Sequence, residues 1–189
     1  MDEASAALHA RLAPCIGVTG PRHWSARPIE QSAIWNFLEA VEDGNPVYWD
    51  DELAASTRFG RMIAPPHAVF ALSMPAFWLP DWLAERQANA AAATPPSPLA
   101  TARAILAEHG FTTVTVVNRE EEYFAPFGPG DGRLSIEERI VSVSPIKQTK
   151  VGAGVFYTFD LDYRTERDDR LVARARSVFL LYNGEGAAG

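Results

Sequence analysis

The feature that most constrains the fold of this chain is a change in hydrophobic periodicity after Gly110. From there to residue 182, apolar and polar side chains alternate with a period of two, the pattern of a β-strand with one buried face. Four segments have this pattern: 112–123, 133–144, 155–164 and 170–182. Because short turns join them, they predict an antiparallel sheet.

One face of such a sheet is apolar and needs a cover. Residues 62–80 contain no Asp, Glu, Lys or Arg, and Phe70, Met74 and Phe77 share one face of a helix. Prolines at positions 65, 66, 75 and 80 would break a lipid-facing span, so we predict a core helix over 66–79 instead. The predicted fold class is α+β, a curved antiparallel sheet wrapped around one long central helix.

The length of 189 residues fits a single domain, which we place at 1–182. Shorter helices are expected near the N-terminus, over 28–42, over 50–57 and over 101–109. Residues 84–110 begin with an Ala-rich and then Pro-rich stretch, so we expect an insertion there. Residues 183–189 are small and polar and are expected to form a flexible tail.

The composition argues against several classes of function. A net charge of −7 argues against a nucleic-acid surface, which needs a basic excess. Cys15 is the one cysteine, so an internal disulfide is impossible and a reducing compartment fits. The histidines have no ligand-like spacing, so no metal site is predicted. The first residues lack the basic start and apolar core of a signal peptide, and we expect a cytoplasmic protein.

Residues 43–50, DGNPVYWD, resemble the hydratase motif of MaoC-like hot-dog proteins, Asp-x-Asn-Pro-x-His-x-Asp. Three later segments are also similar to that family: 58–66 to the approach to its central helix, 122–131 to a strand ending in Pro-x-x-x-Gly-Asp, and 171–177 to its last strand. The match runs in order over roughly residues 16–182. On these residues the chain is identified as a member of the N-terminal MaoC-type dehydratase domains.

The resemblance implies a hot-dog fold, dimers built by pairing two sheets, and thioesters of coenzyme A or of a carrier protein as ligands. The usual activity of the family is hydration of a 2-enoyl thioester, or the reverse dehydration. An Asp and a His of the motif hold and activate the water, which requires a group that titrates near neutral pH. No cofactor is implied beyond the coenzyme A of the substrate.

Two parts of this catalytic apparatus differ here. Asp43 is present, but Tyr48 stands at the histidine position, and a phenol with a pKa of about 10 is a poor base at neutral pH. The family also holds the thioester oxygen with a backbone N–H at the start of the central helix, where this chain has Pro65 and Pro66. Proline has no N–H to donate. No catalytic residue is therefore predicted, and Asp43 with His67 is kept as the runner-up pair.

The preferred hypothesis is a non-catalytic subunit of a heteromeric enoyl-CoA hydratase, with the Asp/His pair on a MaoC-like partner subunit. Pro75 interrupts the central helix and would leave room for a bulky acyl group, such as a steroid side chain. The residues expected to contact the substrate are Asn45, Tyr48, Ile63, Ala64, Pro65, His67, Phe70 and Met74.

Two alternatives remain open. One is a self-sufficient enzyme, either a hydratase that uses Asp43 with His67 or a thioesterase that uses an acidic residue. It predicts turnover by the lone protein that is lost in Asp43→Asn. The other is an interaction module that binds a partner enzyme, such as an aldolase or a thiolase-like protein, and binds no acyl thioester. It predicts a complex without an effect on acyl-CoA binding.

Overall fold

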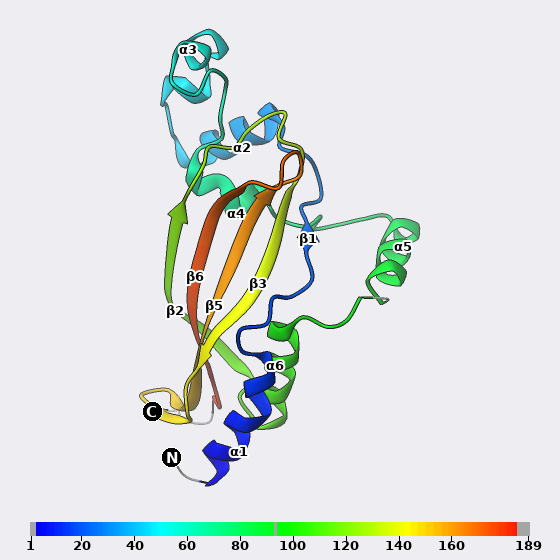
Figure 1. The fold of residues 1–189 in the computed structure, drawn as a ribbon, viewed down its shortest axis with the longest axis vertical. Coiled ribbons are helices and arrows are strands. Elements are labelled where there is room, and N and C mark those ends of the chain that lie inside the picture. Colours follow the sequence, from blue (N-terminus) through cyan, green and yellow to red (C-terminus); the bar gives the residue numbers. More distant parts are fainter. Residues whose placement is uncertain (1–2, 93, 185–189) are drawn as a thin grey trace.

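A computed structural model describes residues 3–92 and 94–184 of the chain as an antiparallel sheet with helices packed against it (Figure 1). The strand order is β1-β3-β5-β6-β2, and β4 pairs with β5 outside this path. The four predicted strands are confirmed as β2 (Thr113–Tyr123), β3 (Leu134–Val143), β5 (Gly152–Thr165) and β6 (Leu171–Tyr182). Two strands were not predicted, β1 (His23–Trp24) and β4 (Lys147–Thr149). Two or three residues are too few to show an alternation.

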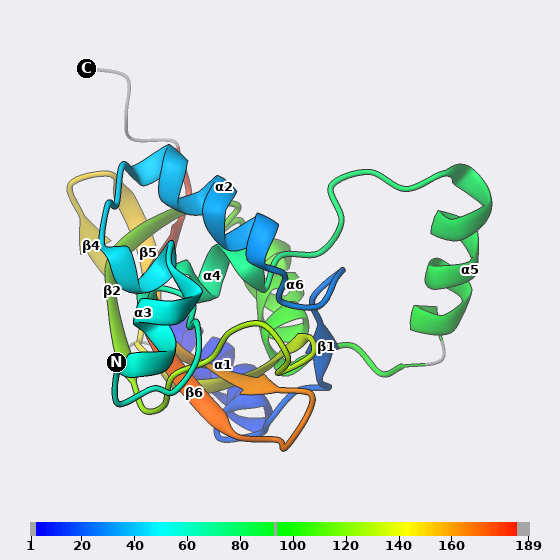
Figure 2. The ribbon, with the colours of Figure 1, turned by 90° about the horizontal axis from the view of Figure 1, so that it is seen from above.

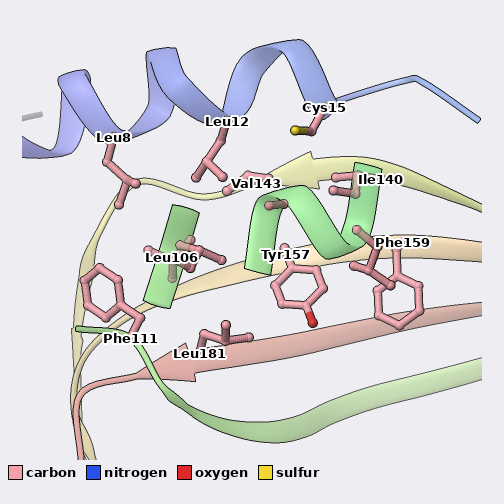
Figure 3. Packing of buried hydrophobic residues seen from close by; sticks show 13 residues of the cluster. Leu8, Leu12, Cys15, Leu106, Phe111, Ile140, Val143, Tyr157, Phe159 and Leu181 are labelled. Atoms are coloured by element: carbon pink, nitrogen blue, oxygen red, sulfur yellow. The ribbon is translucent and has the colours of Figure 1, made fainter. Parts of the chain in front are cut away.

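One half of the inner face of the sheet is covered by α1 (Glu3–Leu12) and α6 (Pro98–Glu108). Figure 3 shows Leu12 of α1 and Leu106 of α6 directed toward Tyr157 of β5, and all three side chains are at most 1% exposed. Burial of large side chains such as these contributes about 1.5–3 kcal/mol each. The two helices therefore pack on the part of the sheet near the chain termini and cover it.

The other half of the inner face packs against α2 (Gln31–Val41) and the segment that follows it. Ile34 and Leu38 of α2 are 0% exposed and belong to one cluster with Tyr163 and Val172 of the sheet. Three further short helices are η1 (Ala13–Cys15), η2 (Pro46–Tyr48) and α3 (Asp51–Ser56).

The central helix is much shorter than predicted. The expected helix over 66–79 is reduced to the 3₁₀ turn η3 (Pro66–Ala68) and the four-residue α4 (Val69–Leu72). Pro75 lacks an N–H, and its ring would clash with the carbonyl of residue 71, so the helix ends before it. Phe77, which was placed on the core face of that helix, is 92% exposed. The prediction of one long central helix was wrong, and α1 and α6 provide much of the missing cover.

The segment 84–110, predicted as one insertion, contains two different parts. The first belongs to α5 (Asp81–Ala92), which projects from the body of the molecule on the side of β1 and away from β2 (Figures 1 and 2). The second is α6, which packs on the sheet. The helix predicted over 101–109 is α6, which begins earlier because the Ser97 hydroxyl accepts the N–H of Ala100 at 3.1 Å. Of the predicted tail 183–189, residues 185–189 lie outside the described part of the chain. Within the described part, every helix is too short or too polar to cross a bilayer.

Candidate functional site

The turn that carries the hydratase-like motif uses its polar side chains to hold its own backbone. The Asp43 carboxylate accepts the N–H of Asn45 at 3.0 Å, and the Asn45 side chain accepts the N–H of Val47 at 3.2 Å. Asn45 is exposed and is the N-cap of η2. Such local side-chain bonds are typical of Asp and Asn in turns and at helix caps. The Asp43 and Asn45 side chains therefore have a structural role, which is to hold the backbone of this turn.

Tyr48, at the histidine position of the motif, lies in the core. It is 9% exposed, and its carbonyl accepts the indole N–H of Trp35 at 3.1 Å. Burial, followed by the nearby charge of Asp43, raises the pKa of the Tyr48 phenol above its ordinary value. The phenol therefore remains neutral around pH 7 and cannot act as a general base there.

The segment before the short central helix offers no backbone donor to a ligand. The N–H of Ala64 donates to the carbonyl oxygen of Phe127 at 2.7 Å, and Pro65 and Pro66 carry no N–H. Ile63 and Ala64 are 4% and 1% exposed and pack in the core. The contact that would stabilise a thioester oxygen is thus absent from residues 64–66.

A cavity of about 720 Å³ lies on the inner face of the sheet, beside η3 and α4. Its lining comes from β1, α6 and the four long strands as well as from the central helix. Two of the predicted contact residues, His67 and Phe70, line this cavity. The others do not: Asn45, Tyr48, Ile63, Ala64, Pro65 and Met74 lie elsewhere, as does Asp43 of the runner-up catalytic pair.

A second hollow, of about 950 Å³, lies between β1 and the projecting α5. Its lining includes Arg27, Trp78 and Leu83. None of the residues predicted to contact the substrate borders it. The smaller cavity is therefore the candidate site, because two of the predicted residues line it and it lies on the central part of the sheet.

Charged side chains on the inner face of the sheet distinguish the candidate cavity. Arg119 of β2 forms an ion pair with Glu121 at 2.6 Å, and its guanidinium lies 5.1 Å from the ring centre of Phe70. It also donates weakly to Ser177 Oγ at 3.4 Å and Tyr163 Oη at 3.5 Å. Burial opposes the charge on Arg119, but the bonds to Tyr163 and Glu121 outweigh it and raise its pKa. The cavity thus combines an apolar floor with a fixed, paired charge on the edge strand.

Sequence reasoning missed these charged residues, although one sequence signal was present. Glu138 occupies the same parity in β3 as Ile136 and Ile140, so it faces inward with them. A charged residue at an apolar position of an alternating strand is costly to bury unless it is paired or hydrogen-bonded, so its presence there is a signal of a functional residue. Arg119 and Glu121 have the corresponding parity in β2, where they pair with inward-facing Ser177 and Ala175.

His67 was expected to be the one histidine near the pocket, but His23 of β1 also lines the cavity. Neither histidine forms an ion pair with a carboxylate in the ranges 3–92 and 94–184. Nor do these ranges contain a cluster of three or more His, Cys, Asp or Glu side chains suited to a metal ion. The lining thus includes two histidines and two glutamates, and no His–Glu ion pair joins them in the described ranges.

Solved structures share this architecture. A chain of the ChsH1-ChsH2 complex from Mycobacterium tuberculosis matches with a TM-score of 0.77 at 23% identity, over 97% of this chain and 94% of that chain. A MaoC-like dehydratase from Rhodospirillum rubrum matches with a TM-score of 0.55 at 20% identity, over 88% and 93% of the two chains. The fold is thus the hot-dog fold of MaoC-like dehydratases, which confirms the predicted hot-dog fold and the α+β class.

Sequence comparison identifies the family. The family described as "FAS1-like, dehydratase domain region" matches residues 16–174. A "Probable enoyl-CoA hydratase alpha subunit" from Thermomonospora curvata is 32% identical over 164 residues, 84% of this chain and 47% of that protein. A "3-oxo-4,17-pregnadiene-20-carboxyl-CoA hydratase alpha subunit" from Mycobacterium tuberculosis is 27% identical over 142 residues, 75% of this chain and 42% of that protein. The chain belongs to the FAS1-like, MaoC-type dehydratase family, and it spans about half the length of these curated relatives.

Proposed function

We propose that this chain is a non-catalytic subunit of a heteromeric enoyl-CoA hydratase that shapes the acyl pocket. In this proposal a MaoC-like partner subunit supplies the catalytic Asp/His pair, and the coenzyme A thioester is the substrate. The observation that carries the proposal is the buried Tyr48 at the histidine position, whose pKa is raised. The missing backbone donor at residues 64–66 is a second, independent loss in the same apparatus.

The open edge of the sheet supports a partner at one particular place. β2 is the last strand of the sheet, and its Val114, Val116 and Val117 are each more than half exposed. An unpaired edge strand with exposed apolar side chains is a ready template for another strand. The family resemblance implies sheet-to-sheet dimers, so we place the partner along β2.

The candidate cavity opens toward that same edge. Phe70 and Val116 both line it, yet they are 48% and 57% exposed. A partner along β2 would cover these side chains and close the cavity on that side. The acyl pocket would then be shared, with the chemistry supplied by the partner.

A bulky acyl group fits the dimensions of the site. The cavity of about 720 Å³ is in the range of sites for drug-sized ligands. The relative from Mycobacterium tuberculosis carries a steroid acyl-CoA in its name. We therefore propose a polycyclic, steroid-like 2-enoyl-CoA as the substrate class.

The decisive experiment is an assay of hydration with crotonyl-CoA and with a steroid side-chain 2-enoyl-CoA. The chain would be tested alone and mixed with a MaoC-like subunit that carries the intact motif. We expect activity from the mixture only, retained in Asp43→Ala of this chain and lost when the motif histidine of the partner is replaced. Activity of the lone chain that disappears in Asp43→Ala or His67→Ala would contradict the proposal.

One observation favours the self-sufficient alternative, namely that His67 borders the cavity. Asp43 does not border it, so a water held between the two side chains lacks a place in this site. A scaffold for an aldolase or thiolase-like enzyme would leave the cavity without a role. In that case the mixture would form a complex, but acyl-CoA affinity would be the same with and without this chain.

A further inference from the structure

A single row of residues crosses the floor of the cavity from one wall to the other. Glu121 of β2 pairs with Ala175 of β6, Ala175 pairs with Leu161 of β5, and Leu161 pairs with Glu138 of β3. The row therefore has a carboxylate at each end and apolar side chains between them. At about 4.8 Å per strand, the ends are about 14 Å apart.

The two carboxylates have different surroundings. Glu121 is neutralised by Arg119 at 2.6 Å and also accepts a hydrogen bond from the Tyr123 hydroxyl. By contrast, Glu138 Oε1 is buried and has no hydrogen-bond partner in the described part of the chain. A buried acceptor without a donor carries the full desolvation cost of that group.

The Glu138 side chain lies against Gly20, which leaves space for it. A Cβ on Gly20 would lie 3.0 Å from Glu138 Cγ and 3.2 Å from Pro98 Cδ, so the absence of a side chain at position 20 makes room for Glu138. The backbone N–H of Gly20 also donates to the Glu138 carbonyl at 2.8 Å, which holds the two residues together.

A cation with free donors lies on the same wall. Arg103 of α6 donates through Nε to the Tyr157 hydroxyl at 3.1 Å and lies 5.9 Å from the ring centre of Phe179. It forms no ion pair within residues 3–92 and 94–184. Because a guanidinium has five N–H donors, Arg103 keeps donors for a ligand. Both residues line the cavity, where Glu138 has one oxygen without a partner and Arg103 has N–H donors beyond the one bound to Tyr157. Within the described residues the two side chains do not bind each other.

We propose that Glu138 and Arg103 select an acyl group that carries a hydroxyl at the end remote from the thioester. This inference rests on the proposed function, in which the partner and the thioester lie toward β2 and this wall lies at the far end. A hydroxyl can donate to Glu138 and accept from Arg103 at the same time. A ketone can only accept, so it leaves Glu138 unpaired, and a hydrocarbon satisfies neither residue.

The test uses the complex of this chain with its MaoC-like partner and two steroid side-chain 2-enoyl-CoA probes. The probes differ only in a ring hydroxyl or a ring ketone at the end remote from the thioester. Because a hydrogen bond to a charged group is involved, we expect kcat/KM to favour the hydroxyl probe by about 10- to 100-fold.

Glu138→Gln should abolish this preference by improving turnover of the ketone probe, because an amide can donate as well as accept. A purely structural role of Glu138 would lower both rates together and leave their ratio unchanged. The matched control is Glu137→Gln, the neighbouring residue on the outer face of β3, where Glu137 pairs with Arg22 at 3.2 Å. It should keep the native ratio.

Equal turnover of the two probes by the native complex, or a ratio that survives Glu138→Gln, would overturn the inference and leave the proposed function intact. Turnover of neither probe and of no other enoyl-CoA would overturn the proposed function, and this inference with it. If Glu138→Gln fails to fold, Arg103→Lys replaces it. That variant should weaken binding of both probes, measured by titration of an inactive complex, and unchanged affinity would count against the proposal.

Discussion

The backbone N–H of Ala64 donates to the carbonyl oxygen of Phe127 at 2.7 Å. This bond joins the segment before the short central helix to the turn that follows β2. It occupies the last backbone donor before the proline pair, and it brings Gly128 against the backbone of Met62 and Ile63. This one bond therefore both removes the Ala64 N–H as a donor for a thioester and accompanies the tight packing at Gly128.

Gly128→Ala should destabilise the protein. The added Cβ would lie 2.9 Å from Met62 O and 3.0 Å from Ile63 Cα, and backbone atoms cannot move away cheaply. We expect a loss of about 1–3 kcal/mol in the free energy of unfolding, measured by chemical denaturation. Gly44→Ala is the matched control, since nothing lies within 4 Å of its added Cβ. Equal stability of the two variants would contradict the packing argument.

Tyr48→His, which restores the motif histidine, should not produce an active lone chain. The Asp43 carboxylate already holds the N–H of Asn45, and residues 64–66 offer no donor for the thioester oxygen. The variant should also lose about 1–3 kcal/mol of stability because a polar ring replaces a core side chain. Crotonyl-CoA hydration by the purified variant checks this, with Tyr48→Phe as the control that keeps the ring. Turnover by the Tyr48→His chain alone would contradict the interpretation that this chain lacks a complete catalytic apparatus.

Val117→Glu should weaken the complex with the partner without unfolding this chain. Val117 lies at the bulge of the edge strand β2 and is 52% exposed, so its substitution places a charge where we locate the interface. We expect at least about tenfold weaker association, measured by analytical ultracentrifugation of the mixture. Val141→Glu is the matched control at the bulge of β3, where Val141 is 37% exposed. Two strands, β5 and β6, separate β3 from β2. An equal effect of both variants would argue against β2 as the interface.

Asp160→Asn should destabilise the protein at neutral pH. Asp160 is 2% exposed, and both of its oxygens bind Arg176, at 2.8 and 2.9 Å. Because Arg176 is half exposed, we expect a loss of only about 1–3 kcal/mol in the free energy of unfolding. Glu108→Gln is the control, since its pair with Arg11 is exposed on both sides, and it should leave the midpoint of unfolding unchanged.

The effect of Asp160→Asn should depend on pH in a defined direction. The hydrogen bonds from Arg176 hold the pKa of Asp160 below its ordinary value of 3.8, despite the opposing effect of burial. The stabilisation is therefore fully present above pH 3.8 and is lost as the pH falls through the lower pKa of the folded state. Denaturation curves of native and variant protein should converge toward acid pH, and a constant difference would contradict this assignment.

Much of the sheet could be predicted because strand alternation is a local property. β5 keeps Val155, Tyr157 and Phe159 on its buried face, as their spacing indicates. The departure of Tyr48 from the family motif is likewise visible in the sequence. The candidate site was predicted only in part, because His67 and Phe70 border the cavity whereas Asn45 and Ile63 do not.

The sequence by itself thus determined the four long strands, the family and the missing histidine, since each depends on neighbouring residues or on a motif. Tertiary structure alone decided how the sheet is covered, because α1 and α6 reach Tyr157 only through contacts distant in the sequence. Tertiary structure also decided which residues line the cavity, because strand register puts Glu121 and Glu138 at the two ends of one row. Register depends on pairing between strands, and no single segment contains that information.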